Sequence, residues 1–180
     1  MTIDIDTITL SRGSHGSREA GMCAMELVAY VANEPHSDHP QCACPVITQF
    51  CISLNDRWDD ETRNRLLKPV LPLVVGTRST SAIENQRAIM IYDWLTRTYT
   101  PAFLELCEAT KADAATVRAL PEIVDEASAR LAIVVLGPIK ARAAAAWDAA
   151  WDAARVALKP AVDQLQPSAI ELLRRLCEVK

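Results

Sequence analysis

The sequence predicts an all-α protein, and three observations support that prediction. Glycine is scarce, with five among 180 residues, so few positions favour sharp turns. No convincing pair of alternating strands joined by a short turn occurs in the chain. Apolar residues instead recur at helical spacing over most of its length. We therefore expect a multi-helix bundle with a short extended N-terminal arm and one long irregular loop near residues 33–44.

The first twenty residues predict an arm followed by a loop. Ile3, Ile5 and Ile8 alternate with Asp and Thr, which indicates a short strand or an extended arm over residues 3–10. One strand cannot form a sheet alone, so a strand here would have to pair with another element, such as one from a second subunit. Residues 11–20 are rich in glycine and serine and predict a loop.

Residues 21–110 are predicted to form the helical core of a single domain that spans residues 1–180. The expected helix starts are residue 22, Pro45, Asp59 or Asp60, Ser81 and Thr100. Ser81 and Glu84 would form a capping box, in which each side chain binds the other's free backbone N–H. The mixed-charge run Arg57–Arg65 is expected to be a solvated helix start.

Residues 111–180 form an alanine-rich helical C-terminal part. Its expected boundaries are Asp113 as a helix cap, Gly137–Pro138 and Pro160 as helix breaks, and Pro167 as the start of the last helix. Trp147 and Trp151 lie four residues apart and therefore share one helix face. That face fits either the domain's own core or the groove of a partner.

Composition limits the classes of partner. The net charge of −4 provides no basic face for nucleic acid, so no nucleic-acid partner is expected. No apolar run approaches the roughly 20 residues that span a bilayer, and the N-terminus lacks the features of a secretory signal. We therefore expect no membrane partner and a cytoplasmic protein, in which the six cysteines stay reduced.

Most residue types that can build a chemical site fall between His15 and Cys44. All three histidines and three of the six cysteines lie in this interval. The candidate groups are His15, Cys23, Glu26, Glu34, His36, Asp38, His39, Cys42 and Cys44. The loop 33–44 contains two prolines, which stiffen it, and a long ordered loop in a compact domain is usually functional.

Two enzymatic interpretations stay open, so the sequence leaves it uncertain whether the protein is an enzyme. In the first, a metal-dependent hydrolase, thiolates and imidazoles hold zinc, although the C-x-C pair departs from the usual C-x₂₋₄-C spacing. Its metal ligands would be His36, His39, Cys42 and Cys44. In the second, Cys23 is the nucleophile of a cysteine-dependent hydrolase, because the start of a helix lowers the pKa of a thiol.

The leading interpretation is a non-enzymatic intracellular binding module, with no cofactor and with a protein or small ligand as its partner. The first helix and the loop 33–44 would form its site. The residues assigned to that site are His15, Cys23, Glu26, His36, Ser37 and Asp38. A third alternative is a structural or assembly protein, in which the N-terminal arm or the tryptophan helix joins copies into a homo-oligomer.

Two stretches resemble an uncharacterised family of proteins from high-GC Gram-positive bacteria and their phages. The first contains the segments GMCAME and EPHSDHPQCACP and covers about 45 residues between Gly13 and Asp56. The second is the alanine-rich Trp-Asp-Ala-Ala helix with the closing segment LQPSAIELLRRL. The resemblance implies kinship with an intracellular accessory protein carried by a phage or a plasmid, and it transfers no catalytic role.

Overall fold

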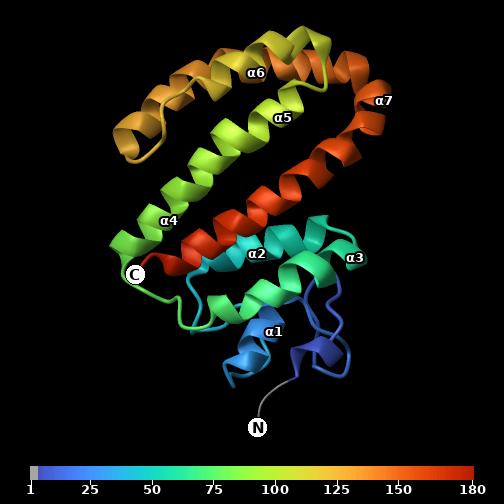
Figure 1. Ribbon diagram of the computed structural model, residues 1–180, viewed down its shortest axis with the longest axis vertical. Helices are drawn as coiled ribbons and strands as arrows, with labels where there is room; N and C mark the ends of the chain where they lie inside the picture. The colour runs from blue at the N-terminus through green and yellow to red at the C-terminus, as the bar shows by residue number, and fades with distance from the viewer. Residues whose placement is uncertain (1–3) are drawn as a thin grey trace. The chain divides into compact units, whose positions relative to one another are not determined.

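The computed structural model describes residues 4–180, except for the side chains of residue 145 and residues 147–157. The all-α prediction is confirmed, since 70% of the chain is helical and no strand occurs among the described residues (Figure 1). The α-helices are α1 (Ala24–Val31), α2 (Pro45–Arg57), α3 (Asp60–Thr62), α4 (Ser81–Trp94), α5 (Thr100–Leu104), α6 (Lys111–Arg118) and α7 (Glu126–Glu178). Two π-helices, η2 (Arg63–Leu67) and η4 (Leu95–Tyr99), and three 3₁₀-helices, η1 (Ile5–Thr7), η3 (Lys68–Val74) and η5 (Glu108–Thr110), complete the described elements.

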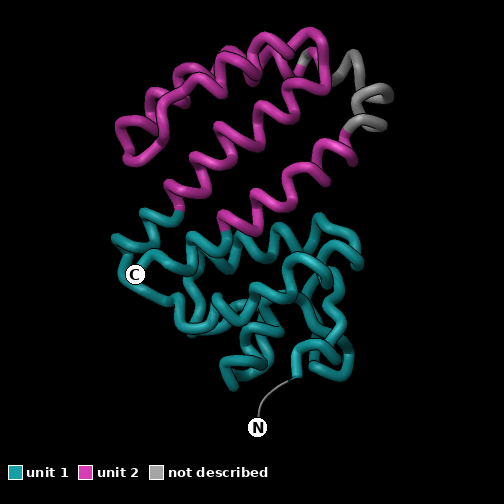
Figure 2. Tube along the Cα trace, viewed as in Figure 1, with its two compact units in different colours: residues 1–87, 173–180 teal, residues 88–172 magenta. Residues whose placement is uncertain are grey.

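The chain divides into two compact units (Figure 2). Unit 1 comprises residues 1–87 and 173–180, and unit 2 comprises residues 88–172. All residues between His15 and Cys44 lie in unit 1. No helix in the described part of the chain has the length and apolar character needed to cross a membrane.

The core of unit 1 is built around α1, whose residues Ala24–Ala29 are all buried. Pro45 begins α2, as predicted, at a position where its missing N–H costs no helical hydrogen bond. The fully buried apolar residues supplied by the other elements of this unit include Leu10, Ile47, Cys51, Leu67, Val74 and Leu176. The first helix is therefore enclosed, and only its ends can present polar groups to a ligand.

A buried arginine joins the end of the chain to the rest of unit 1. The Arg87 guanidinium is 2% exposed and donates to three backbone carbonyls, those of Thr77 (2.6 Å), Leu176 (3.0 Å) and Val179 (2.6 Å). Two of these carbonyls belong to the last residues of the chain, where helical carbonyls lack internal partners. Arg87 therefore fixes the segment 173–180 in unit 1.

Unit 2 has a smaller apolar core. Leu104 of α5, Ala114 and Val117 of α6, and Ile139 of α7 form a buried cluster. Asp113 lies inside the first turn of α6 and pairs with Arg142 (2.6 Å), while Thr110 occupies the cap position. The prediction of Asp113 as the helix cap is therefore wrong by three residues, because a carboxylate also stabilises the first turn itself.

The helix breaks predicted in the C-terminal part are wrong. Pro138, Pro160 and Pro167 all lie inside α7, which runs from Glu126 to Glu178. An internal proline costs about 3 kcal/mol, but it removes only one hydrogen bond, and the alanine-rich sequence between the prolines has high helix propensity. The side chains of Trp147 and Trp151 lie outside the described residues.

Two predictions about helix ends and strands also need correction. Ile5–Thr7 form a 3₁₀ turn capped by Asp4, so the strand alternative for residues 3–10 is wrong. The start of α4 is capped by Thr80, whose Oγ1 accepts from the Ile83 N–H (3.4 Å), and not by Ser81. The Thr80 hydroxyl, one residue before Ser81, reaches the same free N–H groups of the first turn. The sequence pattern therefore could not decide between Thr80 and Ser81 as the cap.

Candidate functional site

A buried carboxylate lies at the centre of the candidate site. Glu26, in the first turn of α1, is 1% exposed. Its Oε1 accepts from the backbone N–H of His15 (2.6 Å), and its Oε2 accepts from the backbone N–H of Cys23 (2.7 Å) and from His15 Nδ1 (2.9 Å). Glu26 thereby caps its own helix and holds the preceding loop against it.

His15 connects this carboxylate to a serine. Its Nδ1 donates to Glu26, because an ionised carboxylate only accepts. In the neutral ring Nε2 is then the acceptor, and the Ser11 hydroxyl lies 2.8 Å from it and donates to it. Ser11, His15 and Glu26 therefore form a continuous chain of hydrogen bonds, and the first of these residues was not among the predicted site residues.

His36 approaches the same carboxylate from the other side. Its Nε2 donates to the backbone carbonyl of His15 (3.0 Å) and lies 3.5 Å from Glu26 Oε1. Its Nδ1 is buried and has no hydrogen-bond partner among the described residues. The structure thus brings together three of the predicted site residues, one each from the loop 11–20, helix α1 and the loop 33–44.

The hydrogen bonds decide the charge of Glu26. Burial alone raises the pKa of a carboxyl, but the donors on His15 and Cys23 outweigh burial and hold the pKa of Glu26 below its ordinary value. Glu26 is consequently ionised at neutral pH.

The surroundings of Cys23 disfavour the reactivity expected of its thiol. Its side chain is 4% exposed, and burial raises the pKa of the Cys23 thiol to about 12, with the neighbouring Glu26 charge acting in the same direction. The start of α1 was expected to lower that pKa, but the negative charge of Glu26 occupies the same helix terminus. Cys23 is therefore a protonated thiol at neutral pH and a poor nucleophile.

The loop 33–44 is fixed from within. The Glu34 carboxylate accepts from the backbone N–H groups of Gln41 (2.6 Å) and Cys42 (2.8 Å), and the Ser37 hydroxyl accepts from the His39 N–H (3.0 Å). These bonds close the loop across its base and at its tip. The side chains of Glu34 and Ser37 thus satisfy three backbone N–H groups of the loop.

The four predicted metal ligands have separate roles. His36 faces Glu26, whereas His39 is 58% exposed and pairs with Asp38 (2.8 Å). Cys44 is buried as the residue before α2, and burial raises the pKa of the Cys42 thiol. Among the described residues, no group of three or more His, Cys, Asp or Glu side chains is placed to hold a metal ion.

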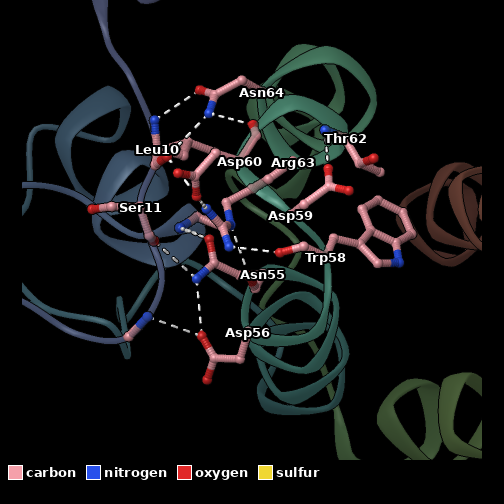
Figure 3. Close-up of polar contacts among 12 residues, drawn as sticks. Leu10, Ser11, Asn55, Asp56, Trp58, Asp59, Asp60, Thr62, Arg63 and Asn64 are labelled. Carbon is pink, nitrogen blue, oxygen red and sulfur yellow. Dashed lines mark hydrogen bonds and ion pairs between the residues drawn. The ribbon is translucent and has the colours of Figure 1, made fainter. Parts of the chain in front are cut away.

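A buried clamp, not anticipated from the sequence, holds the segment before His15 (Figure 3). Arg63 is 1% exposed and donates to the carbonyls of Asn55 (2.7 Å) and Trp58 (2.7 Å), and more weakly to that of Leu10 (3.5 Å). Asn64 binds both backbone groups of Leu10, accepting at 2.8 Å and donating at 3.0 Å. The expectation that Arg57–Arg65 is solvated is therefore wrong at Arg63.

The same clamp continues past Ser11. Asn55 donates to the Ser11 carbonyl (3.1 Å) and accepts from the Ala24 N–H (3.0 Å), while Asp56 accepts from the Gly13 N–H (3.0 Å). The segment around Ser11 is thus anchored on both sides by the end of α2. Arginine and asparagine side chains are usually exposed, so the burial of this clamp is not expected from residue type. The signal that could have identified it is the number of side chains with several N–H donors in residues 55–64.

Gly21 provides a direct test of the His15 position. Its φ is +140°, and a Cβ there would lie 2.6 Å from His15 Cδ2 and 2.9 Å from His15 Nε2. Gly21→Ala is expected to lower the free energy of unfolding by about 1–3 kcal/mol through backbone strain, and to displace the ring from Ser11. Urea denaturation and the His15 ring resonances would measure the two effects.

Gly16 supplies the matched control. It lies in the same loop, and no heavy atom stands within 4 Å of the position of its Cβ. Gly16→Ala is expected to change stability by less than about 0.5 kcal/mol, the usual range for a surface substitution. Equal effects of the two substitutions would contradict the packing of His15 against Gly21.

No family model matches the chain, and neither a curated protein nor a solved structure matches it.

Proposed function

We propose that unit 1 is an intracellular recognition module for a protein partner and that the loop 33–44 provides its binding surface. One observation supports the proposal above others. The loop is fixed from within, yet the side chains at its tip, Asp38 and His39, are 36% and 58% exposed and contribute little to the core. A rigid loop that presents polar groups on a packed scaffold is the usual form of a binding site.

The exposed groups at the tip are also held in one orientation. Asp38 Oδ1 pairs with His39 Nδ1 at 2.8 Å, and His39 Nε2 lies 3.2 Å from Gln49 Nε2 on α2. Side chains that are ordered before binding lose less conformational entropy when a partner arrives. This order favours specific recognition over loose electrostatic contact.

The base of the loop offers a second contact point. The Arg18 guanidinium lies 4.4 Å from the centroid of the Tyr30 ring and donates to the Glu34 carbonyl (3.2 Å). Tyrosine and arginine are the residue types that most often dominate the energy of protein interfaces. The proposed binding surface therefore consists of the loop tip together with Arg18 and Tyr30.

The state of the cysteines fits the proposed intracellular location. All six cysteines are free thiols in the structure. Free thiols persist in a reducing compartment, whereas exported proteins of this size more often form disulfides. An accessory protein of a phage or plasmid, as the sequence resemblance implies, would meet its partner in that compartment.

The proposal can be tested by site-specific cross-linking. A photoreactive amino acid replaces the exposed Gln41 in the full chain, expressed in the cell that makes the protein, and the captured partner is purified. Its dissociation constant is then measured for the wild type and for the double variant Asp38→Ala, His39→Ala. We expect at least tenfold weaker binding by the variant, equivalent to about 1.4 kcal/mol, with unchanged helical content by circular dichroism.

Glu61→Ala is the matched control, because Glu61 is an exposed charged residue of unit 1 that lies outside the proposed surface. This variant should bind with the wild-type dissociation constant. A captured partner that binds the Asp38, His39 double variant as tightly as it binds the wild type would refute the proposed surface.

A further inference from the structure

We propose that Ser11 is a nucleophile activated by His15 and Glu26, and that unit 1 accepts small acyl groups from carboxylic esters or thioesters and releases them to water. This activity goes beyond the recognition function proposed above and rests on different residues. Its basis is the chain of hydrogen bonds that runs from Ser11 through His15 to Glu26.

The distances fit an activated serine. Ser11 Oγ lies 2.8 Å from His15 Nε2, and His15 Nδ1 lies 2.9 Å from Glu26 Oε2. A nucleophile within hydrogen-bond reach of a base, with the base oriented by a third group, is the arrangement by which hydroxyls are activated on unrelated folds. The three residues occupy these positions although they come from a short stretch of sequence.

The carboxylate is itself fixed in place. Backbone N–H groups of His15 and Cys23 donate to the two oxygens of Glu26 at 2.6 Å and 2.7 Å. With both oxygens held, Glu26 fixes the tautomer and the plane of the His15 ring. It also stabilises the imidazolium that forms when His15 accepts the serine proton.

The backbone of the nucleophile is equally constrained. The Ser11 N–H donates to the Met22 carbonyl (2.9 Å), and the Ser11 carbonyl accepts from Asn55 (3.1 Å). Figure 3 shows the Ser11 hydroxyl pointing away from Asn55 and the rest of the clamp. The clamp therefore fixes the main chain of Ser11, while the side-chain Oγ binds only His15 among the described residues. A positioned nucleophile is expected to have its backbone held in this way.

Ser11 and His15 are partly exposed, unlike the thiol nearby. The His15 side chain is 15% exposed and Ser11 is partly exposed, and the added Cβ positions of Gly13 and Gly16 meet no heavy atom within 4 Å. The adjoining loop is therefore open. The Cys23 side chain is 4% exposed, and burial raises the pKa of its thiol to about 12, whereas Ser11 is partly exposed and its hydroxyl lies 2.8 Å from His15 Nε2.

The reaction would proceed in two balanced steps. Ser11 Oγ attacks the carbonyl carbon while its proton moves to His15 Nε2, and the bond to the leaving alcohol or thiol then breaks as His15 returns the proton to the leaving group. Water next attacks the acyl-serine ester, with His15 accepting a proton from the water. His15 then returns that proton to Ser11 Oγ, and the carboxylic acid leaves.

The test uses the full chain with two probes, a fluorophosphonate and 4-nitrophenyl acetate. The wild type is expected to take up one phosphonyl group on the peptide that contains Ser11, identified by mass spectrometry. It is also expected to release 4-nitrophenol at least tenfold faster than Ser11→Ala does. Ser14→Ala is the matched control, since Ser14 is an exposed serine of the same loop, and it should keep both properties.

A second variant separates activation from mere exposure of the hydroxyl. His15→Ala leaves Ser11 in the chain but removes the base, so the acylation rate is expected to fall by about 10²- to 10⁴-fold. Circular dichroism shows whether each variant keeps its helical content. Should His15→Ala lose it, the comparison of Ser11→Ala with Ser14→Ala decides the proposal by itself.

Two results would overturn the proposal. One is a folded wild type that incorporates no more phosphonate than Ser11→Ala does, and the other is equal loss of activity in Ser11→Ala and Ser14→Ala. Either result would leave the recognition function untouched, because that function is tested at Asp38 and His39. Failure of the binding test would likewise not affect acylation of Ser11 by a small ester.

Discussion

Replacing Arg63 by methionine is expected to lower the free energy of unfolding by about 3–5 kcal/mol, the range for losing the central member of a buried polar network. Two carbonyls, those of Asn55 and Trp58, would lose donors at 2.7 Å, and each unsatisfied buried group costs about 1–3 kcal/mol. Asp60 contributes little to this effect because its side chain is 82% exposed. Urea denaturation followed by circular dichroism measures the change.

Arg65→Met is the control for this prediction. Arg65 is exposed in the same π-helix and differs from Arg63 mainly in burial, so its replacement should cost less than about 0.5 kcal/mol. Arg63→Lys keeps the charge but loses the planar fork that reaches two carbonyls at once, and it is expected to be nearly as destabilising as methionine. A fully stable Arg63→Met variant would show that Arg63 contributes nothing to the stability of the fold.

Replacing Glu26 by glutamine is expected to lower the free energy of unfolding by about 2–3 kcal/mol at neutral pH. The amide of glutamine turns one acceptor oxygen into a donor, which then faces N–H groups of His15 or Cys23. The glutamine NH₂ group and the backbone N–H that faces it are both donors, so both are left without an acceptor. Together they cost about 1–3 kcal/mol. Loss of the charge that holds His15 Nδ1 adds to this cost.

The pH dependence of this variant has a defined sign. The pKa of Glu26 is lower in the folded state than its ordinary value near 4.5, so its contribution is fully present above that value and is lost as the pH falls through the folded pKa. The stability difference between wild type and Glu26→Gln should therefore be constant above about pH 5 and shrink below it. Denaturation at several pH values, with the exposed Glu61→Gln as control, measures this trend; a difference that grows toward low pH would contradict it.

The helical elements follow from local sequence to a large extent. Pro45 and Asp59 begin or cap helices where their side chains predict it, because capping depends on one or two side chains and the adjacent backbone. The helix breaks predicted at Pro138 and Pro160 are wrong because the rule that predicts them is also local. A proline rule considers one turn, whereas the length of α7 depends on the whole alanine-rich segment.

The candidate site was only partly predictable. His15 and His36 stood out because the chain has only three histidines, and Glu26 stood out because it lies between them in the sequence. Ser11 lies only four residues from His15, but its main chain is held by Asn55, which is 44 residues away, and Asn64 holds Leu10 across 54 residues. No periodicity or spacing rule encodes contacts at that separation, so the sequence could place the histidines near one another but could not identify the serine.

The discontinuity of unit 1 has a consequence during synthesis on the ribosome. Arg87 is translated 92 residues before Val179, the last carbonyl that accepts from its guanidinium. At 5–20 residues per second, about 5–20 s pass before that partner leaves the ribosome. During this interval residues 88–172 emerge, and the Arg87 guanidinium lacks two of its acceptors, the carbonyls of Leu176 and Val179. Unit 1 can therefore close only after residues 173–180 have left the ribosome, and force-sensitive arrest-peptide measurements along the nascent chain would detect that closure only beyond this point.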